Sequence, residues 1–318
     1  MTTGAPTSRR ASAGFWSSAK SFNLPVGPLI EADGIGGYPI DLRVKAAAPE
    51  GLPVQLRGPG SLHVGLTQYG LGCFERWLSG EGEPWLHSAL AVGRHLVEIQ
   101  EPDGSWLHYE PFPHTFPLAP PWASGITQGQ GASLLVRLHR ETRDENLAAA
   151  ARLALAPLHV PQANGGVQGV LGGMPWPEEY PTTPQSHVLN GAIFALWGMR
   201  DVGVALGCET SQAHFARGVE SLVVNLPRFD TGSWSLYSLY PHPIHNRASS
   251  FYHDLHVNQL AAMMELAPRP EFIAMSQRWA RYADSRRSRA SAFAWKAAFR
   301  LLVPRNRVFA RAAPWTKL

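Results

Sequence analysis

Apolar residues recur at helical spacing through most of the chain after Gly60. Within each stretch they stand three or four positions apart, which places them on one face of an α-helix. Longer links with strand-like pieces separate every second helix from the next. We therefore interpret the helices as four pairs. The eight predicted helices are 62–79, 86–100, 124–141, 145–158, 185–205, 211–226, 253–266 and 270–283.

A short sequence echo supports a repeating architecture. Residues 103–109 (DGSWLHY) and 231–237 (TGSWSLY) share the pattern GSWxxY, and each follows a helix that would close a pair. The opening helices start about 62 residues apart. Helical pairs of this period predict a mainly α fold, an incomplete (α/α) toroid whose inner helices surround a concave floor. An irregular helical domain with a chance echo is the alternative.

The first sixty residues follow a different pattern. They are rich in Pro and Gly and contain one strand-like run, Tyr38–Lys45. We divide the chain into an N-terminal extension with a short β element (1–60), a helical domain expected to carry the chemistry (61–285) and a C-terminal tail (286–318). The segment from residue 1 to 23 lacks a continuous apolar stretch, so we do not expect a cleaved secretory signal.

Composition narrows the class of protein. A chain of 318 residues that is 45% apolar and 16% charged can bury a large core. It contains no run of 18 apolar residues, so no membrane span is predicted. Cys73 and Cys208 lie in apolar helical patterns without metal-ligand spacing, and we expect buried, unpaired thiols in a reducing compartment, the cytoplasm.

Charge is distributed unevenly. The chain has a formal net charge of +4; residues 286–318 contribute +9, so residues 1–285 carry −5. The tail interleaves these cations with aromatic side chains at helical spacing. It can be a closing helix packed on the domain, or it can rest on an anionic membrane at the inner face. No reading motif accompanies the basic residues, so we expect no nucleic-acid partner.

Three polar clusters interrupt the apolar pattern. In 176–184 (WPEEYPTTP), the prolines favour an extended segment that presents Glu179 and Tyr180, either on opposite sides or both towards a cleft. A solvated acidic pair, Glu178 and Glu179, is the alternative. Tyrosine and glutamate can transfer protons without a cofactor, and we expect none.

The other two clusters lie within predicted helices. In 250–259 (SFYHDLHVNQ), Tyr252 and His256 share a helical face. The histidine pair at 253 and 256 lacks a convincing third metal ligand, so we favour hydrogen-bonding histidines at a cavity wall over a metal site. In 126–132 (ITQGQGA), two glycines weaken a helix beside two glutamines, which suggests close approach of a ligand or helix. No nucleotide-binding loop, serine elbow or Cys/His nucleophile motif is present.

These strings identify a resemblance. The chain resembles the C-terminal domain of D-glucuronyl C5-epimerases, enzymes that convert glucuronic to iduronic acid in heparosan-type chains, over roughly residues 62–283. The resemblance implies an incomplete (α/α) barrel of four helical pairs. It is carried by the strings SGITQGQ (124–130), EEYPTTP (178–184), VLNG (188–191), LPRFDTGSW (226–234) and YHxxHVNQL (252–260).

The resemblance also implies site residues. The family's active-site glutamate, the following tyrosine and two further tyrosines fall on Glu179, Tyr180, Tyr237 and Tyr252. In and around the matching strings we expect further side chains to contact substrate. They are Gln128, Gln130, Trp176, Thr182, Asn190, Trp234, Arg247, His253, His256 and Asn258.

Two departures concern the substrate. Animal members have arginines where this chain has Tyr240 and Ser249, and an acidic residue where it has Phe251. Such arginines would hold carboxylate or sulfate groups. Arg247, two positions before Ser249, is the residue that we expect to take the place of the missing arginine. The large N-terminal domains of the animal members have no counterpart in the first sixty residues.

The resulting hypothesis is cofactor-free C5 epimerisation of D-glucuronate to L-iduronate in a glycosaminoglycan-like polysaccharide. Glu179 and Tyr252 exchange a proton on opposite faces, while Tyr180 and Tyr237 bind the carboxylate or the C4 oxygen. Three alternatives stay open. They are a uronate lyase, a silent binding protein for acidic polysaccharide, and a glycosidase with Asp254 as a weak second acid. A homodimer is also an option.

Overall fold

The computed structural model describes residues 29–30, 36–56, 61–110 and 114–305. Nine α-helices and one two-stranded antiparallel sheet form in this part of the chain. The helices are α1 (His63–Leu78), α2 (Glu83–Glu98), α3 (Gly125–Thr142), α4 (Glu145–Leu153), α5 (Leu189–Ala205), α6 (Glu209–Asn225), α7 (Ser250–Leu266), α8 (Pro270–Asp284) and α9 (Arg286–Leu302). The strands are β1 (Gln168–Leu171) and β2 (Met174–Pro177).

All eight predicted helices form, and two of their ends shift by more than three residues. The fourth stops at Leu153, and a separate turn of 3₁₀-helix follows at Ala156–Leu158. The fifth starts at Leu189 rather than at 185, because the proline-rich segment before it continues in a non-helical form. The ninth helix occupies the basic tail.

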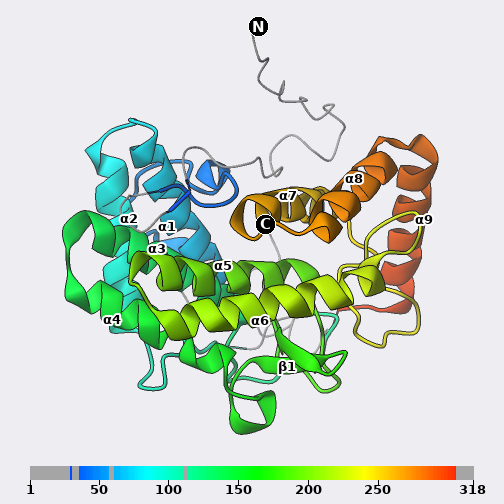
Figure 1. Ribbon diagram of the computed structural model, residues 1–318, viewed down its shortest axis with the longest axis horizontal. Coiled ribbons are helices and arrows are strands. Elements are labelled where there is room, and N and C mark those ends of the chain that lie inside the picture. Colours follow the sequence, from blue (N-terminus) through cyan, green and yellow to red (C-terminus); the bar gives the residue numbers. More distant parts are fainter. Residues whose placement is uncertain (1–28, 31–35, 57–60, 111–113, 306–318) are drawn as a thin grey trace, which may run out of the picture.

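The helices form four successive pairs. In Figure 1 they run from α1 and α2, through α3 to α6, to α7 and α8 at the other end. The first helices of the pairs, α1, α3, α5 and α7, contact one another in chain order, and each packs against its own second helix. The protein is thus mainly α, with the inner and outer helices of an incomplete (α/α) toroid, as the sequence predicts.

Glycines let the two central inner helices approach closely. A Cβ atom on Gly198 of α5 would collide with the backbone of Gly129 in α3. Gly129 meets the backbone of Ala195 in the same way. The helix-weakening glycine beside the two glutamines therefore serves helix packing.

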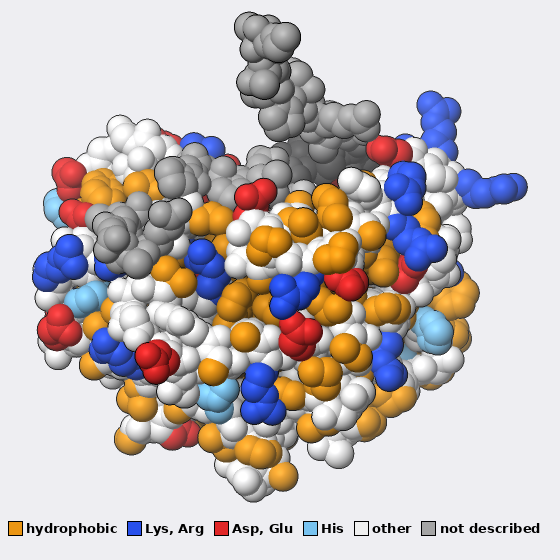
Figure 2. Space-filling model, in the orientation of Figure 1, with side chains coloured by type: hydrophobic (Ala, Val, Ile, Leu, Met, Phe, Trp, Pro, Cys, Tyr) orange, Lys and Arg blue, Asp and Glu red, His pale blue; other side chains and the backbone are white. Residues whose placement is uncertain are grey.

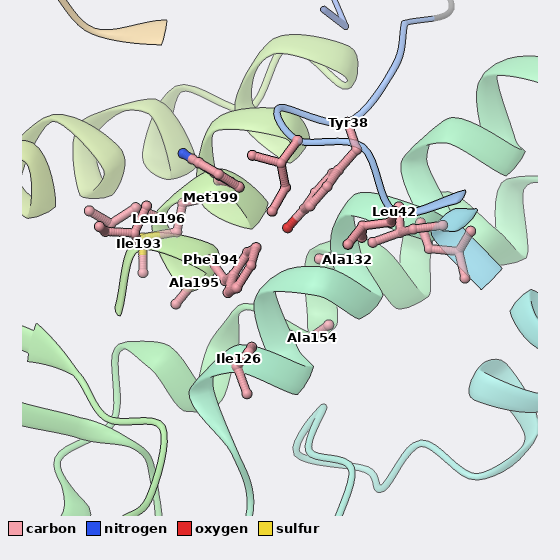
Figure 3. Close-up of a cluster of buried hydrophobic side chains, with 14 of the residues drawn as sticks. Tyr38, Leu42, Ile126, Ala132, Ala154, Ile193, Phe194, Ala195, Leu196 and Met199 are labelled. Carbon is pink, nitrogen blue, oxygen red and sulfur yellow. The ribbon is translucent and has the colours of Figure 1, made fainter. Parts of the chain in front are cut away.

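The run 38–45 was predicted as a strand, and this prediction is wrong. Residues Arg43–Lys45 form a 3₁₀ turn, and the segment before it pairs with no described strand. Tyr38, Ile40 and Leu42 are fully buried, but Pro39 is buried as well and Val44 is exposed, so burial does not alternate along the whole run. The first three side chains enter the helical core, where Tyr38 and Leu42 lie among residues of α3 and α5 (Figure 3).

A buried ion pair ties this segment to the core. Arg137 of α3 binds Asp201 of α5, with Nη1 2.6 Å from Oδ2. Its Nη2 donates to the carbonyl of Gly37 over 2.9 Å, and Nε donates to Gly36 over 3.2 Å. Residues 36–46 thus share one core with the helices. The division at residues 60 and 285 stays a prediction.

Helix α9 closes the described chain against α7 and α8. Its Ala292 and Phe299 are buried, whereas Phe293, Leu301 and Leu302 are exposed. Lys and Arg side chains protrude at the α8–α9 end of the molecule (Figure 2). For the described part of the tail, the structure thus shows a packed closing helix. Membrane contact stays a prediction, and residues 1–23 and 306–318 lie outside the described chain.

Two further expectations concern the thiols and the membrane. Cys73 is buried and unpaired, as predicted, and Cys208 is unpaired but only half-buried. Among the described helices, none combines the length and the apolar character needed to cross a bilayer.

Candidate active site

A cavity of about 330 Å³ lies where the inner helices begin. Its wall includes Val64 of α1, Ile126 of α3, Asn190 of α5 and Tyr252 of α7, each within the first turn of its helix. The N-terminus of a helix carries a partial positive charge from its unpaired N–H groups. Four such ends around one cavity favour an anionic ligand.

The loop after β2 brings Glu179 and Tyr180 to this cavity. The start of α3 holds the loop, because Gly125 N–H donates to the carbonyl of Glu178 over 2.9 Å. The Ser124 hydroxyl donates to the carbonyl of Glu179 over 2.8 Å. Both side chains line the cavity, which was one of the two expected arrangements.

The two adjacent glutamates have different surroundings. Glu178 turns away from the cavity and accepts hydrogen bonds from the Ser186 hydroxyl at 2.7 Å and from His187 N–H at 2.8 Å. Its Oε1 lies 2.6 Å from His187 Nδ1. Both glutamates are buried, so the alternative of a solvated acidic pair is wrong. Glu178 fixes the loop, which leaves Glu179 for the cavity.

Glu179 sits in a site shaped for its carboxylate. Asn190 Nδ2 donates to Oε2 over 3.3 Å, and the Tyr180 hydroxyl also donates to the carboxylate. A Cβ atom on Gly191 would lie 2.5 Å from Glu179 Oε2, so only glycine leaves room there. Burial raises the pKa of Glu179 to about 7, although both hydrogen bonds oppose the rise. The group can therefore accept or release a proton near neutral pH.

Three tyrosines extend the network from Glu179. Side-chain hydrogen bonds link Tyr180 to Tyr237 and Tyr237 to Tyr252. The rings of Tyr237 and Tyr252 lie 4.8 Å apart between centroids. Burial raises the pKa of Tyr252 to about 12, and it raises the pKa values of Tyr180 and Tyr237 well above 10. The three hydroxyls therefore keep their protons at neutral pH and can act as proton donors.

The loop that carries Tyr237 is held on both sides. Tyr237 N–H donates to Asn246 over 2.8 Å, and its carbonyl accepts from Leu189 N–H over 3.2 Å. The Trp234 indole donates to the carbonyl of Ala248 over 2.9 Å and stacks on His253, with ring centroids 3.7 Å apart. These contacts set the position of Tyr237 relative to α7, and therefore relative to Tyr252.

Basic side chains complete the wall, and sequence reasoning missed them. Lys296 and Arg300 come from α9, Arg305 from the residues just after it, and Lys45 from the N-terminal segment. Among the described lining residues, Glu179 is the only carboxylate. The Lys and Arg residues spaced along the tail were the available signal in the sequence. However, nothing in the sequence shows that they lie beside Glu179, which is more than a hundred positions earlier.

Five of the fourteen predicted site residues meet in this cavity: Glu179, Tyr180, Asn190, Tyr237 and Tyr252. The others lie outside its lining. Gln128 uses its amide on backbone groups, donating to Gly104 over 2.9 Å and to Ala154 over 2.7 Å and accepting from Trp106 N–H over 3.0 Å.

Three further predicted residues have partners in the scaffold. Gln130 accepts from the Thr67 hydroxyl over 3.4 Å. Trp176 stacks on Phe229, with ring centroids 5.6 Å apart. The Thr182 hydroxyl donates to the carbonyl of Pro184 over 2.8 Å. Trp234 and Asn258 also lie outside the cavity lining.

The two histidines of α7 share one partner. Ser235 Oγ lies 2.8 Å from His253 Nδ1 and 2.9 Å from His256 Nδ1, while His253 Nε2 contacts the carbonyl of Trp279 at 3.0 Å. The two histidines therefore hold the loop that carries Tyr237, and they do not line the cavity. Arg247 points to α9, where its guanidinium lies 4.6 Å from the centre of the Trp295 ring. In the described residues, no group of three His, Cys, Asp or Glu side chains is arranged to hold a metal ion.

The fold and the cavity define a helical toroid with a carboxylate–tyrosine network at one end. Residues 100–281 match the model of the D-glucuronyl C5-epimerase C-terminus. The chain therefore belongs to the D-glucuronyl C5-epimerase C-terminal family.

Two relatives show the extent of the similarity. The D-glucuronyl C5-epimerase of Caenorhabditis elegans is 31% identical over 221 residues, which are 64% of this chain and 36% of that protein. An uncharacterized protein of Methanocaldococcus jannaschii is 26% identical over 195 residues, 57% of this chain and 62% of that protein. The chain thus spans less than two thirds of the length of either relative.

Solved structures of glucuronyl hydrolases are more distant. The unsaturated glucuronyl hydrolase of Bacillus sp. GL1 is 16% identical with a TM-score of 0.45, covering 72% of this chain and 61% of that one. The enzyme from Streptococcus agalactiae is 14% identical with a TM-score of 0.44, covering 70% and 57%.

Proposed function

We propose that the protein epimerises C5 of D-glucuronate residues to L-iduronate in a heparosan-type polysaccharide, by removal and return of a proton without a cofactor. One observation carries this proposal: Glu179, with its pKa near neutrality, shares a cavity with three hydrogen-bonded tyrosines at the N-termini of the inner helices. Family membership supports the same reaction.

The chemistry assigns different roles to the two ends of the network. Ionised Glu179 removes the C5 proton, and the electron pair of the C–H bond moves into the substrate carboxylate, giving an enolate-like dianion. Tyr252 then donates its phenolic proton to the opposite face of C5. This forms the new C–H bond and leaves a phenolate. Positioned donors around the dianion lower the barrier most.

The hydroxyls between the two groups can restore the starting state. After one turnover Glu179 is protonated and Tyr252 is ionised. Tyr180 and Tyr237 connect them by hydrogen bonds, so a proton can pass back along the chain. The direction agrees with the pKa values, about 7 for Glu179 and about 12 for Tyr252. Asn190 holds the carboxylate of Glu179 in place.

The test is deuterium incorporation at C5 of heparosan in heavy water, followed by NMR. Glu179→Gln and Tyr252→Phe should each abolish incorporation, whereas Glu145→Gln, at an exposed carboxylate of α4, should leave the rate unchanged. Full exchange in both variants would remove the pair from the mechanism.

The same assay separates the other functions. A lyase would release an unsaturated uronate that absorbs in the ultraviolet, and a silent binding protein would bind heparosan without exchange. A two-carboxylate glycosidase is disfavoured, because no second Asp or Glu lies among the described residues of the cavity wall.

A further inference from the structure

Helix α9 lies outside the part of the chain that matches the family model, which ends at residue 281. It nevertheless forms one wall of the cavity (Figure 1, at the end beyond α8). Lys296, Phe299 and Arg300 are its lining residues. Two of the cationic side chains in the wall that Glu179 shares, Lys296 and Arg300, therefore come from a helix outside the matched region.

Lys296 is held in one position by the loop that carries the catalytic network. Its Nζ donates to Asn246 Oδ1 over 2.7 Å and to the carbonyl of Arg247 over 2.9 Å. It also lies 5.9 Å from the ring centre of Tyr237 and 5.0 Å from that of Phe299. An ammonium group has three N–H donors, so one remains for a ligand in the cavity.

No described carboxylate forms an ion pair with Lys296. The ion pairs of the described chain involve other cations, and the two acceptors of Lys296 are neutral amide oxygens. Burial, with Arg300 nearby, lowers the pKa of Lys296 to about 8. Lys296 is half-buried, so it has lost part of its hydration without gaining a described counter-charge. A bound anion would offset that cost.

The position of Lys296 in the cavity wall also bears on the arginines that the family resemblance implies and this chain lacks. The arginines of animal members fall here on Tyr240 and Ser249, so the matching positions supply no cation. Ser249 lines the cavity and Tyr240 packs on Phe116, with ring centroids 5.2 Å apart. Cationic groups reach the same cavity from α9 instead.

We propose that Lys296 binds the carboxylate of the reacting uronate and that the exposed Arg300 and Arg305 bind an adjacent acidic sugar of the polymer. The site is thereby selective for uronate over neutral sugar, an inference that rests on the proposed function. Lys296 also balances the second negative charge that develops when C5 loses its proton.

The experiment measures binding by calorimetry. A heparosan oligosaccharide is compared with the same oligosaccharide after reduction of its carboxylates to alcohols. The wild-type protein should prefer the uronate form by about tenfold or more, the value of one charge-assisted hydrogen bond. Lys296→Met should lower this preference by about tenfold and leave only the part that Arg300 and Arg305 supply. Lys296→Arg should keep most of the wild-type preference, and Arg287→Met, an exposed charge on the same helix, should keep all of it.

The outcomes distinguish this inference from the proposed function. Lys296→Gln can still donate to both amide oxygens and should fold even where the Met variant does not. It should lower the preference by the same factor as Lys296→Met. An unchanged preference in the neutral variants, or none in the wild type, overturns the role of Lys296 even if C5 exchange occurs. A preference that depends on Lys296, without C5 exchange, upholds the inference and refutes the epimerase.

Discussion

The two GSWxxY loops begin alike and end differently. Gly104 and Gly232 both have positive φ angles, 88° and 78°. Trp106 and Trp234 are both buried and donate their indole N–H to a backbone carbonyl, over 2.8 and 2.9 Å. The final tyrosines differ, since Tyr109 is 62% exposed whereas Tyr237 is 6% exposed and lines the cavity.

The difference shows which part of the motif is scaffold. In both loops the motif follows the second helix of a pair, where the glycine forms a tight turn and the indole is buried. Tyr109 donates to Glu101 over 2.6 Å at the surface. Tyr237 is turned inwards by Leu189 and Asn246, which bind its backbone on either side. The chemistry thus depends on the neighbours of the second loop.

The tyrosine pair should give the largest contrast. Tyr237→Phe should lower the rate of C5 exchange about 100-fold or more, because it removes a donor to the reacting groups. Tyr109→Phe removes only an exposed hydrogen bond and should leave the rate unchanged. Exchange rates of the two variants check this, and equal rates would contradict a role for Tyr237 in the reaction.

Glu179, near Tyr237, and Glu101, bonded to Tyr109, should differ in how they affect the free energy of unfolding. Burial raises the pKa of Glu179 from 4.5 to about 7, so the folded state favours the protonated form and loses stability as the pH rises between these values. Glu179→Gln removes this loss and should be more stable than the wild type by about 3 kcal/mol at pH 8, with no such gain below pH 4.5.

Denaturant unfolding at pH 4 and pH 8 measures this difference. Glu101→Gln, at the exposed hydrogen bond of Tyr109, is the matched control, since water solvates that carboxylate. A stability difference for Glu179→Gln that is the same at both pH values would contradict the raised pKa. The kcat/KM of the wild type should rise through about pH 7, as Glu179 loses its proton, and fall above about pH 8, as Lys296 loses its proton.

The tryptophans should separate stability from activity. Trp106→Phe and Trp234→Phe should each cost about 2 kcal/mol of unfolding free energy, through a lost buried hydrogen bond and a small cavity. Only Trp234→Phe should also slow C5 exchange, by about tenfold, because Trp234 stacks on His253 and holds the Tyr237 loop. Equal effects of both variants on exchange would mean that the Tyr237 loop needs no such support.

The helices and their pairing were predictable because their signal is local. Apolar residues spaced three or four positions apart mark one face of a helix, and the eight segments were found from this spacing. The strand at 38–45 was mispredicted because alternating apolar residues indicate burial and not a partner strand. Tyr38 and Leu42 are buried without a partner strand, and they pack on helices instead.

The site was predictable only in part. Glu179 and its tyrosines stand in long, distinctive strings. Gln128 and His253 lie in equally distinctive strings, yet their hydrogen bonds go to the backbone of other loops or to a supporting serine. Sequence cannot show whether a buried polar group faces a ligand or a backbone group. Lys296 was missed because its place depends on how α9 packs against a loop fifty residues earlier.

The central claim is that Glu179 and Tyr252 act on opposite faces of one sugar. A crystal structure of the Glu179→Gln variant with a heparosan oligosaccharide tests it most directly. The account predicts C5 of a glucuronate between the two side chains, with the residue 179 amide and the Tyr252 hydroxyl each within about 3.5 Å on opposite sides of the ring. A sugar bound with both groups on the same face, or with C5 outside the cavity, would contradict it.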